Sequence, residues 1–248
     1  MRYLILSDIH SNLEAFQAVL EMARGKYDQA ACLGDVVGYG PDPNAVIGLL
    51  RQISCAVIRG NHDKACSGIT TIEDLNPIAK LAILWTRQQL TPENLAYLRQ
   101  LQAGPLAMAG FEMVHGSAED EDQYLFGPAE AIPALRKQAA PLVLFGHTHH
   151  QGGFALSHRG LFKSIAARSH RKERVMTVDL RDGARYLINP GSTGQPRDRD
   201  WRAAFAILDE SKRQIEFYRA PYELALTQKK MAQAGLPQFL IDRLSVGR

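Results

Sequence analysis

The first half of the chain repeats one pattern: a short apolar run, a polar or glycine-rich loop, and then an amphipathic helix. Residues 2–6 form the first apolar run, and a capping box at Ser11–Glu14 starts a helix with one apolar face. The run that ends at Leu33 and the run at 55–58 repeat this arrangement. Alternating units of this kind are typical of α/β proteins, so we expect parallel strands in this half.

Short β-like runs dominate the second half of the chain. They lie at 153–157, 174–179, 184–188, 203–208 and 214–219. Between the halves, residues 74–101 have the pattern of two helices divided at Thr91 and Pro92, and we expect residues 68–103 to form a helical lid. No repeat, low-complexity tract or linker divides the sequence, so we expect a single domain over residues 1–248.

Charge and cysteine content argue against several classes of protein. Lys and Arg number 29 and Asp and Glu number 26, so the net charge is only +3 and we expect no stable binding to nucleic acid. The three cysteines form no CxxC pair, which argues against a disulfide framework and a thiolate zinc site. The N-terminal segment turns polar after six residues, unlike a signal peptide or a membrane span. We therefore expect a cytoplasmic protein that does not associate with membranes.

Side chains that can bind metals follow the predicted strands. They are Asp8, His10, Asp35, Asn61, His62, His115, His147 and His149. Residues i and i+2 of an extended chain point the same way, so Asp8 with His10, and His147 with His149, could each face one cavity. An isolated Asp-x-His or His-x-His is more often a surface or structural feature. Five such segments in order, four of them with a glycine that permits close approach, favour a functional site.

The ordered segments SDIH, GDVVGYG, GNHD, VHGS and GHTH resemble the motifs of the calcineurin-like metallophosphoesterase superfamily. They span residues 7 to 149. The segment NPGSTGQPRDRD at 189–200 resembles the closing loop of the small bacterial and archaeal phosphodiesterase branch. The resemblance implies an α/β fold with two mixed β-sheets packed as a sandwich and flanked by helices.

The resemblance also implies two divalent transition-metal ions. By this resemblance Asp8, His10 and His149 hold one ion, Asn61, His115 and His147 hold the other, and Asp35 bridges them. Imidazole and oxygen ligands without thiolate suit Mn, which we expect, with Fe, Zn, Ni or Co as alternatives. A hydroxide that bridges the two ions is the implied nucleophile, which attacks the phosphorus in line.

Other segments of the motifs have implied roles in substrate binding and proton transfer. His62 would act as the general acid, the alternative being a structural histidine. Arg197, Gly191 and Ser192 would contact the substrate, although Arg197 could instead be a solvated arginine in an ordinary turn. The acidic stretch 119–122 has no implied role and is expected to be a solvated loop.

The sequence departs from the family's Ser/Thr protein phosphatases, which carry GDxVDRG where this chain has GDVVGYG. This difference disfavours protein phosphatase activity, and it leaves no aspartate at the position that orients the acid histidine in those enzymes.

We therefore expect a metal-dependent phosphodiesterase that acts on a small phosphate ester. A hydrolase of nucleotides or dinucleoside polyphosphates is the main alternative. A non-catalytic metal-binding scaffold is disfavoured because all seven ligand positions and His62 are filled, and a repair exonuclease because no additional DNA-binding domain is evident. The oligomeric state is not predicted by the sequence.

Overall fold

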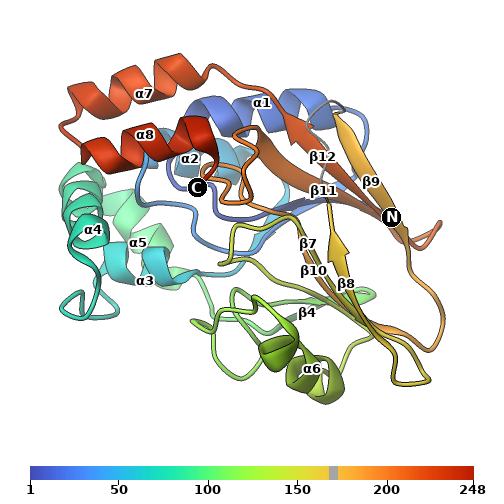
Figure 1. Cartoon of the computed structure of the whole chain (residues 1–248). Helices are drawn as coiled ribbons and strands as arrows, with labels where there is room; N and C mark the ends of the chain where they lie inside the picture. The colour runs from blue at the N-terminus through green and yellow to red at the C-terminus, as the bar shows by residue number, and fades with distance from the viewer. Residues whose placement is uncertain (168–172) are drawn as a thin grey trace.

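Two six-stranded β-sheets lie at the centre of the molecule (Figure 1). The computed structural model describes residues 1–167 and 173–248. The first sheet contains, in order, β3 (Cys55–Val57), β2 (Gln29–Cys32), β1 (Arg2–Leu6), β11 (Ala203–Asp209), β12 (Gln214–Ala220) and β9 (Arg174–Asp179). The second contains β4 (Leu106–Met108), β5 (Phe111–Met113), β6 (Leu142–Leu144), β10 (Arg185–Asn189), β7 (Gly152–Leu156) and β8 (Phe162–Ala166).

Both sheets mix parallel and antiparallel pairs. In the first sheet β1, β2 and β3 are parallel, whereas β11, β12 and β9 are antiparallel to their neighbours. In the second sheet β5, β6 and β10 are parallel, and β4, β7 and β8 join as antiparallel strands. The expected fold, two mixed sheets packed as a sandwich and flanked by helices, is confirmed.

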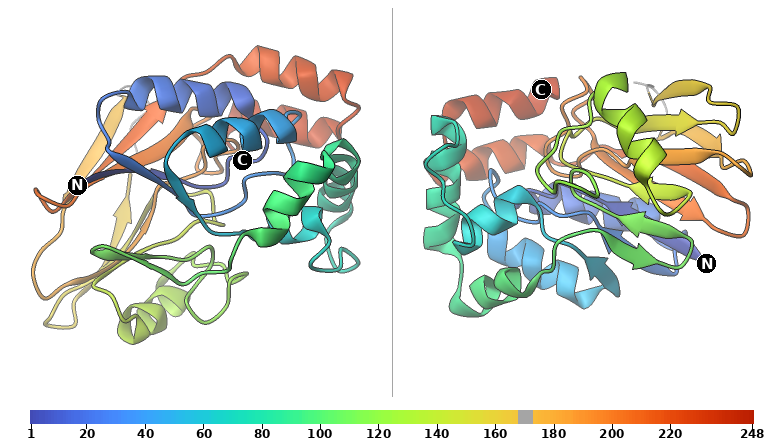
Figure 2. Two further views of the ribbon diagram at one scale, coloured as in Figure 1. Left: turned by 180° about the vertical axis from the view of Figure 1, so that it is seen from behind. Right: turned by 90° about the horizontal axis from the view of Figure 1, so that it is seen from below.

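Helices cover the outer faces of both sheets (Figure 2). The first sheet is covered by α1 (Leu13–Ala23) and α2 (Pro43–Gln52), and the second by α6 (Pro128–Lys137). At one end lie α3 (Asn61–Ser67), α4 (Pro77–Gln89) and α5 (Pro92–Gln100), and the chain finishes with α7 (Leu224–Gln233) and α8 (Gln238–Val246). Among the described residues, no helix has both the length and the apolar character needed to cross a membrane.

The first sheet has an apolar cluster on each face because successive residues of a strand point to opposite faces. On β1, Leu4 and Leu6 pack into the cluster beneath α1 and α2. Tyr3 and Ile5 point the other way, into the cluster between the two sheets, where they lie with Phe217. These side chains are almost fully buried, and loss of a phenyl group from such a core costs about 3–5 kcal/mol. The layered core holds the two sheets in fixed relation to each other.

The packing brings the carboxyl ends of six parallel strands together. The loops that follow β1, β2 and β3 come from the first sheet, and those that follow β5, β6 and β10 come from the second. Every residue that the sequence singled out as functional lies in one of these loops or at the start of α3. The fold therefore places the candidate site where the two sheets meet, at their carboxyl edges.

Three local features differ from the sequence predictions. The cap of α1 is Asn12, whose side chain accepts a hydrogen bond from the Ala15 amide, and not Ser11 of the expected capping box. The short helix α3 was not predicted, because its seven residues are too few to show a helical period. The strand β8 was also missed, because its residues alternate only weakly between apolar and polar.

The two helices expected at 74–101 are present as α4 and α5, and both are attached to α3. The Arg87 guanidinium donates to the Ala65 carbonyl, and the Arg99 guanidinium donates to the Ser67 carbonyl. A lid movement of residues 68–103 would have to break these bonds or carry α3 with it. The lid and the single domain over residues 1–248 stay predictions.

Candidate metal centre

Backbone hydrogen bonds hold the loops of the site against one another. The Asp8 amide donates to the Gly34 carbonyl and the His10 amide to the Asp35 carbonyl, each at 3.0 Å, so the loops after β1 and β2 run side by side. In the second sheet the Gly146 amide donates to the His115 carbonyl at 2.9 Å. The functional side chains therefore project from a framework that is fixed by main-chain bonds.

Five of the seven predicted ligands have a left-handed backbone conformation. Their φ angles are 52° at Asp8, 48° at His10, 53° at Asp35, 64° at His147 and 60° at His149. Residues with a side chain rarely adopt this conformation, which costs of order 1–3 kcal/mol at each position and clusters at functional sites. Contacts with the surrounding structure must therefore stabilise the backbone conformation of these five residues.

Two glycines let the loops approach closely enough to form the site. A Cβ atom at Gly60 would lie 2.2 Å from Oδ1 of Asp35, and one at Gly146 would lie 2.1 Å from Oγ of Ser7. Neither distance is possible for a real side chain. The glycines of GNHD and GHTH therefore serve the close approach that the sequence pattern predicted.

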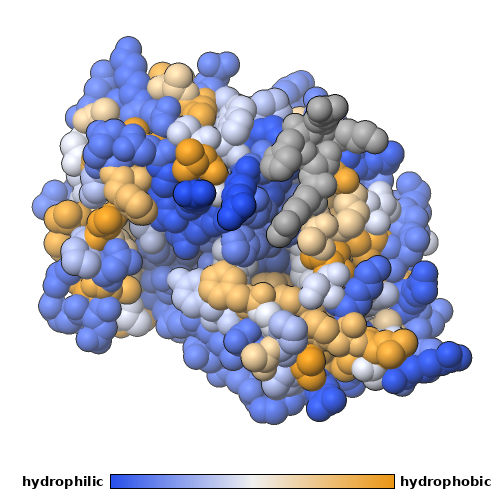
Figure 3. All heavy atoms as spheres, viewed as in Figure 1, coloured by the Kyte–Doolittle hydropathy of each residue, from blue (hydrophilic) through white to orange (hydrophobic). Residues whose placement is uncertain are grey.

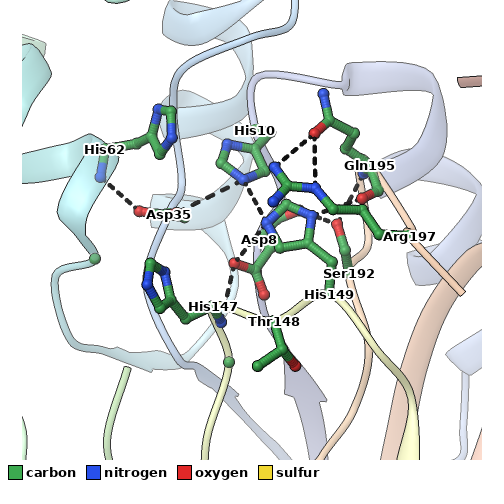
Figure 4. A network of polar contacts seen from close by, with 12 residues as sticks. Asp8, His10, Asp35, His62, His147, Thr148, His149, Ser192, Gln195 and Arg197 are labelled. Atoms are coloured by element: carbon green, nitrogen blue, oxygen red, sulfur yellow. Dashed lines mark hydrogen bonds and ion pairs between the residues drawn. The ribbon is translucent and has the colours of Figure 1, made fainter. Parts of the chain in front are cut away.

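The first cluster of candidate ligands consists of Asp8, His10, Asp35 and His149 (Figure 4). One ligand atom from each lies within 4.8 Å of the others, and each residue is at most 1% exposed. Nε2 of His10 lies 3.2 Å from Nε2 of His149, and Nε2 of His149 lies 3.3 Å from Oδ1 of Asp8. This cluster could hold a metal ion.

The hydrogen-bond partners of the Nδ1 atoms determine the tautomers of His10 and His149 in the first cluster. Nδ1 of His10 lies 3.2 Å from the Val37 carbonyl oxygen, and Nδ1 of His149 lies 2.6 Å from the Gln195 carbonyl oxygen. Carbonyl oxygens only accept, so both Nδ1 atoms carry hydrogen. Burial lowers the pKa of both rings well below the ordinary value, which leaves them neutral. Their Nε2 lone pairs therefore face each other.

The second cluster consists of Asp35, His115 and His147, with Asn61 beside them. Nε2 of His115 lies 3.2 Å from Oδ1 of Asn61, and its Nδ1 lies 2.7 Å from the Leu33 carbonyl oxygen. His147 has the opposite ring orientation to His115. Its Nε2 lies 3.0 Å from the Asp122 carbonyl oxygen, so Nδ1 is left as the ligand atom. Mixed imidazole and oxygen donors characterise this cluster too.

Asp35 belongs to both clusters. Its Oδ1 accepts a hydrogen bond of 2.8 Å from the His62 amide, which leaves Oδ2 as the oxygen that faces the site. Oδ2 lies 3.6 Å from Nε2 of His10 in the first cluster and 3.5 Å from Nε2 of His115 in the second. A single carboxylate oxygen thus lies between the imidazoles of the two clusters.

The electrostatics of the site favour positive charge. Burial, opposed by His115 and reinforced by Asp35, raises the pKa of Asp8 to about 7. Burial alone would lower the pKa of His115, but the negative charge of Asp35 outweighs it and raises that pKa to about 9. Two adjacent buried carboxylates thus draw a cation to the site.

These residues fit a divalent transition metal. Oδ2 of Asp8 and Oδ2 of Asp35 are buried and have no hydrogen-bond partner among the described residues. Buried carboxylate oxygens without a partner are costly, and so are imidazole lone pairs that face each other. A cation among them removes both penalties, and donors of this kind suit Mn, Fe, Zn, Co or Ni.

His62 lies beside the clusters but is not part of either. Its ring packs against Tyr39 with ring centroids 4.3 Å apart and against His10 with centroids 4.9 Å apart. Burial lowers its pKa to about 4, and its Nδ1 has no partner among the described residues. Asp63 does not orient the ring, since its carboxylate accepts from the Val37 and Gly60 amides. The ring is positioned by packing and by the bond from its own amide to Asp35.

The closing loop, residues 189–200, supports the first cluster from behind. The Ser192 hydroxyl donates to the Asp8 carbonyl at 2.8 Å and accepts from the Gln195 amide at 2.8 Å. Ser192 is fully buried and Gly191 is buried, so neither could contact a substrate unless this loop moved. The Ser192 hydroxyl positions Asp8 instead, and the Gly191 amide donates to Oδ1 of Asn189 within the loop.

Arg197 lies at the mouth of the site, which we define by Tyr39, Tyr124, Arg197 and Arg243. The Arg197 guanidinium donates to Oε1 of Gln195 at 2.9 Å and lies 5.7 Å from the centre of the Tyr39 ring. Burial and the charge of Arg197 lower the pKa of Arg243 to about 10. Two guanidinium groups are therefore near each other at this mouth.

Sequence reasoning missed Tyr124 and Arg243. The Tyr124 ring stacks on His147 with centroids 3.8 Å apart. Arg243 lies on α8, more than forty residues beyond the last motif, and no spacing rule connects it to the site. Tyr124 had one available signal, since it follows the acidic stretch that comes directly after His115.

The acidic stretch 119–122 has a structural role that the sequence did not reveal. Glu121 pairs with Arg59 at 3.0 Å and with Lys64 at 2.9 Å, and Asp122 pairs with Lys64 at 2.7 Å. Lys64 is only 4% exposed. Glu119, Asp120 and Asp122 are exposed, as expected of a solvated loop, whereas Glu121 is partly buried. The ion pairs of Glu121 and Asp122 hold in place the carbonyl that accepts from His147.

The chain belongs to the calcineurin-like phosphoesterase superfamily, whose domain model matches residues 1–213. Members of this family are metal-dependent phosphoesterase hydrolases and typically bind divalent metals, and the two clusters are a candidate site for them. The expectation from the motifs is confirmed at this level.

Three relatives match nearly the whole chain. A metallophosphoesterase from Sphaerobacter thermophilus is 37% identical, and its crystal structure superimposes with a TM-score of 0.84 over 100% of this chain and 99% of that one. An uncharacterized protein of Methanocaldococcus jannaschii, MJ0912, is 33% identical over 258 residues, which cover 98% of this chain and 97% of the relative. The hypothetical protein PH1004 from Pyrococcus horikoshii OT3 is 19% identical with a TM-score of 0.79, over 100% of this chain and 98% of that one, and shows a shared fold.

Proposed function

We propose that the protein is a phosphodiesterase that works with two divalent metal ions. The observation that carries this proposal is the position of Oδ2 of Asp35, unpartnered between His10 at 3.6 Å and His115 at 3.5 Å. One oxygen shared by two ligand clusters is the arrangement that a bridging carboxylate requires. Two-metal sites of this type are common among phosphatases and nucleases.

The residues divide into two ligand sets. Asp8, His10 and His149 would hold one ion, Asn61, His115 and His147 the other, with Asp35 shared between them. The donor set favours Mn as the native metal, with Fe, Zn, Ni or Co as alternatives. When bound, two divalent ions supply an activated water and neutralise charge on the phosphate during in-line displacement.

His62 serves as the general acid for the leaving alcohol. It lies against His10 at the edge of the first cluster, and its buried Nδ1 has no hydrogen-bond partner among the described residues. Burial lowers its pKa to about 4, so the ring is neutral near pH 7 until an anion binds beside it. The negative charge of a bound phosphate favours the protonated ring, which can then donate to a poor leaving group.

Arg197 binds a non-bridging oxygen of the phosphate, and Arg243 adds positive charge at the mouth. The guanidinium of Arg197 is oriented by Gln195, and a planar guanidinium can make two parallel hydrogen bonds to phosphate. Each charged hydrogen bond of this kind contributes about 1.5–3 kcal/mol. We assign Gly191 and Ser192 to positioning the Asp8 loop and not to substrate contact.

A hydrolase of nucleotides or dinucleoside polyphosphates is the alternative. The observation that favours it is the exposed Tyr124 ring, which stacks on the candidate ligand His147 and is 43% exposed. An exposed aromatic face next to a phosphate site suits a substrate with a planar base.

The test is removal and restoration of metal. The chelated protein receives Mn, and hydrolysis of bis(p-nitrophenyl) phosphate and of p-nitrophenyl phosphate is compared in wild type and His62→Ala. We expect Mn to restore diester cleavage, and His62→Ala to lower it about 100-fold or more while bound Mn stays equal, since a general acid contributes about 10²–10⁴-fold. Absence of turnover on either ester with two Mn bound would contradict the proposal.

A further inference from the structure

A second cavity opens beside the metal centre. It has a volume of about 770 Å³, within the range of cavities that bind small molecules. Thr148 and His150, the neighbours of two candidate ligands, form part of its wall together with Arg197. Figure 3 shows that this face of the molecule is hollowed near its middle, with apolar side chains on the side of α6. We call this space the side cavity.

A stack of aromatic rings leads from the metal centre to the side cavity. Tyr124 lies on His147 with centroids 3.8 Å apart and an interplanar angle of 23°. Phe126 continues the stack, 5.2 Å from Tyr124 and tilted from it by only 5°, and lies 5.6 Å from His150. Phe126 and His150 both line the side cavity. The rings therefore form a continuous surface from a candidate ligand to the cavity wall.

Phe126 and Tyr124 in this stack are more exposed than large aromatic side chains usually are. Phe126 is 58% exposed and Tyr124 is 43% exposed, although large apolar side chains are usually covered. Two nearly parallel exposed rings next to a polar site offer a stacking surface for another planar group. The lining of the cavity also includes the apolar side chains Phe154 and Ile165.

Charge at the rim of the side cavity favours an anionic ligand. Arg197 and Arg199 both line it, and Arg199 is held in a left-handed conformation with φ of 69° by a bond from its amide to the Gly247 carbonyl at 2.8 Å. Asp198 also lines the cavity, but its charge is paired with the buried Arg219. Two cationic side chains therefore line the cavity together with its apolar residues.

We infer that the side cavity is the subsite for the planar base of a nucleotide whose phosphate lies at the metal centre. A base stacked on Phe126 lies next to Arg197 and Arg199, which are placed to contact the sugar and phosphate. The inference rests on the proposed function, because it takes the phosphate position from the metal centre. It goes further by naming the substrate class and the residues that select it.

The experiment compares two ligands that differ only in the base. Binding of AMP and of ribose 5-phosphate to the Mn-loaded protein is measured by calorimetry, without turnover. Stacking of one base on aromatic side chains contributes about 1–3 kcal/mol, so AMP should bind about 10-fold more tightly or better. Phe126→Ala should remove this preference, and Phe126→Tyr should retain it.

A matched control separates the subsite from general effects of mutation. Leu81→Ala removes a side chain of similar exposure, 57%, on the surface of α4, and it should leave the AMP preference unchanged. Equal affinity for AMP and ribose 5-phosphate in wild type, or a preference that survives Phe126→Ala, overturns the inference. Cleavage of bis(p-nitrophenyl) phosphate is measured separately, so absence of a base preference in wild type with turnover intact overturns the subsite alone and leaves the proposed function standing.

Discussion

The first and second clusters share Asp35 but differ in how they are enclosed. Every ligand of the first cluster is at most 1% exposed, and the closing loop supports it through bonds to His149 and to the Asp8 carbonyl. In the second cluster His147 is 4% exposed and Asn61 is only partly buried. The supporting segment there is the exposed acidic stretch with Tyr124.

The difference in enclosure implies that the two ions differ in affinity and in role. The first cluster has two carboxylates and two imidazoles, so it should bind its ion more tightly than the second, which has only the shared carboxylate. The second cluster lies against Tyr124, and the stacked rings of Tyr124 and Phe126 lead from it to the side cavity. We therefore expect a tightly held ion in the first cluster and a weaker, substrate-facing ion in the second.

The largest expected effect comes from the residue that the clusters share. Asp35→Asn removes the only charge common to both, so the protein should lose both ions at micromolar Mn. Because metal ions contribute several kcal/mol of charge stabilisation in such sites, diester turnover should fall by roughly 1,000-fold or more. Bound Mn is measured by atomic absorption after gel filtration.

The control for Asp35→Asn is Asp28→Asn. Asp28 pairs with Arg2 on the surface, far along the first sheet from the metal centre, and an exposed pair contributes little. Asp28→Asn should keep both ions and full turnover. Retention of two ions by Asp35→Asn would contradict the bridging role.

The next prediction separates the two clusters. His149→Ala removes a ligand of the first cluster, and His147→Ala removes a ligand of the second. Loss of an outer partner of a ligand typically weakens metal binding about 10–100-fold, so loss of a ligand itself should exceed about 100-fold for its own ion. Stepwise Mn titration should show that His147→Ala keeps the tight step and that His149→Ala loses it. Identical Mn binding curves for His149→Ala and His147→Ala would contradict the assignment of these two residues to different ions.

A smaller effect is expected at the mouth. Arg197→Ala removes charged hydrogen bonds to the phosphate, so kcat/KM for a diester should fall about 10–100-fold with both ions still bound. Arg197→Lys should recover only part of the loss, because an ammonium group cannot bind two oxygens in parallel. An unchanged kcat/KM in Arg197→Ala would show that this arginine is only a solvated loop residue.

The smallest effect tests the support of the first cluster. Ser192→Ala removes the hydroxyl that donates to the Asp8 carbonyl, a neutral bond that contributes about 0.5–1.5 kcal/mol. Affinity for the tight ion should fall by about 10-fold or less, with the weak ion unchanged. Lys64→Met, which removes the ion pairs of Lys64 with Glu121 and Asp122, should weaken binding of the second ion instead. If Ser192→Ala and Lys64→Met changed the affinities for both ions equally, the closing loop and the acidic stretch would not support different clusters.

Much of this site could be predicted from the sequence because short motifs encode it. Asp8 and His10 follow a strand in the first half of the chain, where alternating apolar runs and helices indicated parallel pairing. His147 and His149 repeat the same i, i+2 spacing after β6. The glycines beside them signal close approach, and Gly60 and Gly146 meet that requirement. Local pattern and the geometry of parallel sheets were sufficient here.

Other contacts could not be predicted, because they join segments distant in the chain. Arg243 reaches the mouth from α8, and its approach depends on how α8 packs on Tyr39. The bonds from Lys64 to Glu121 and Asp122 join residues more than fifty positions apart, and neither partner carries a local signal. The short helix α3 is likewise set by tertiary packing, since seven residues are too few for an amphipathic period.

The most direct test of the account is a Mn titration of the metal-free protein in which bound Mn and cleavage of bis(p-nitrophenyl) phosphate are followed in the same samples. We predict that the first equivalent binds tightly with little turnover, and that turnover rises as the second equivalent binds. Full turnover at one equivalent, or saturation at one equivalent with no turnover, would contradict a two-metal phosphodiesterase.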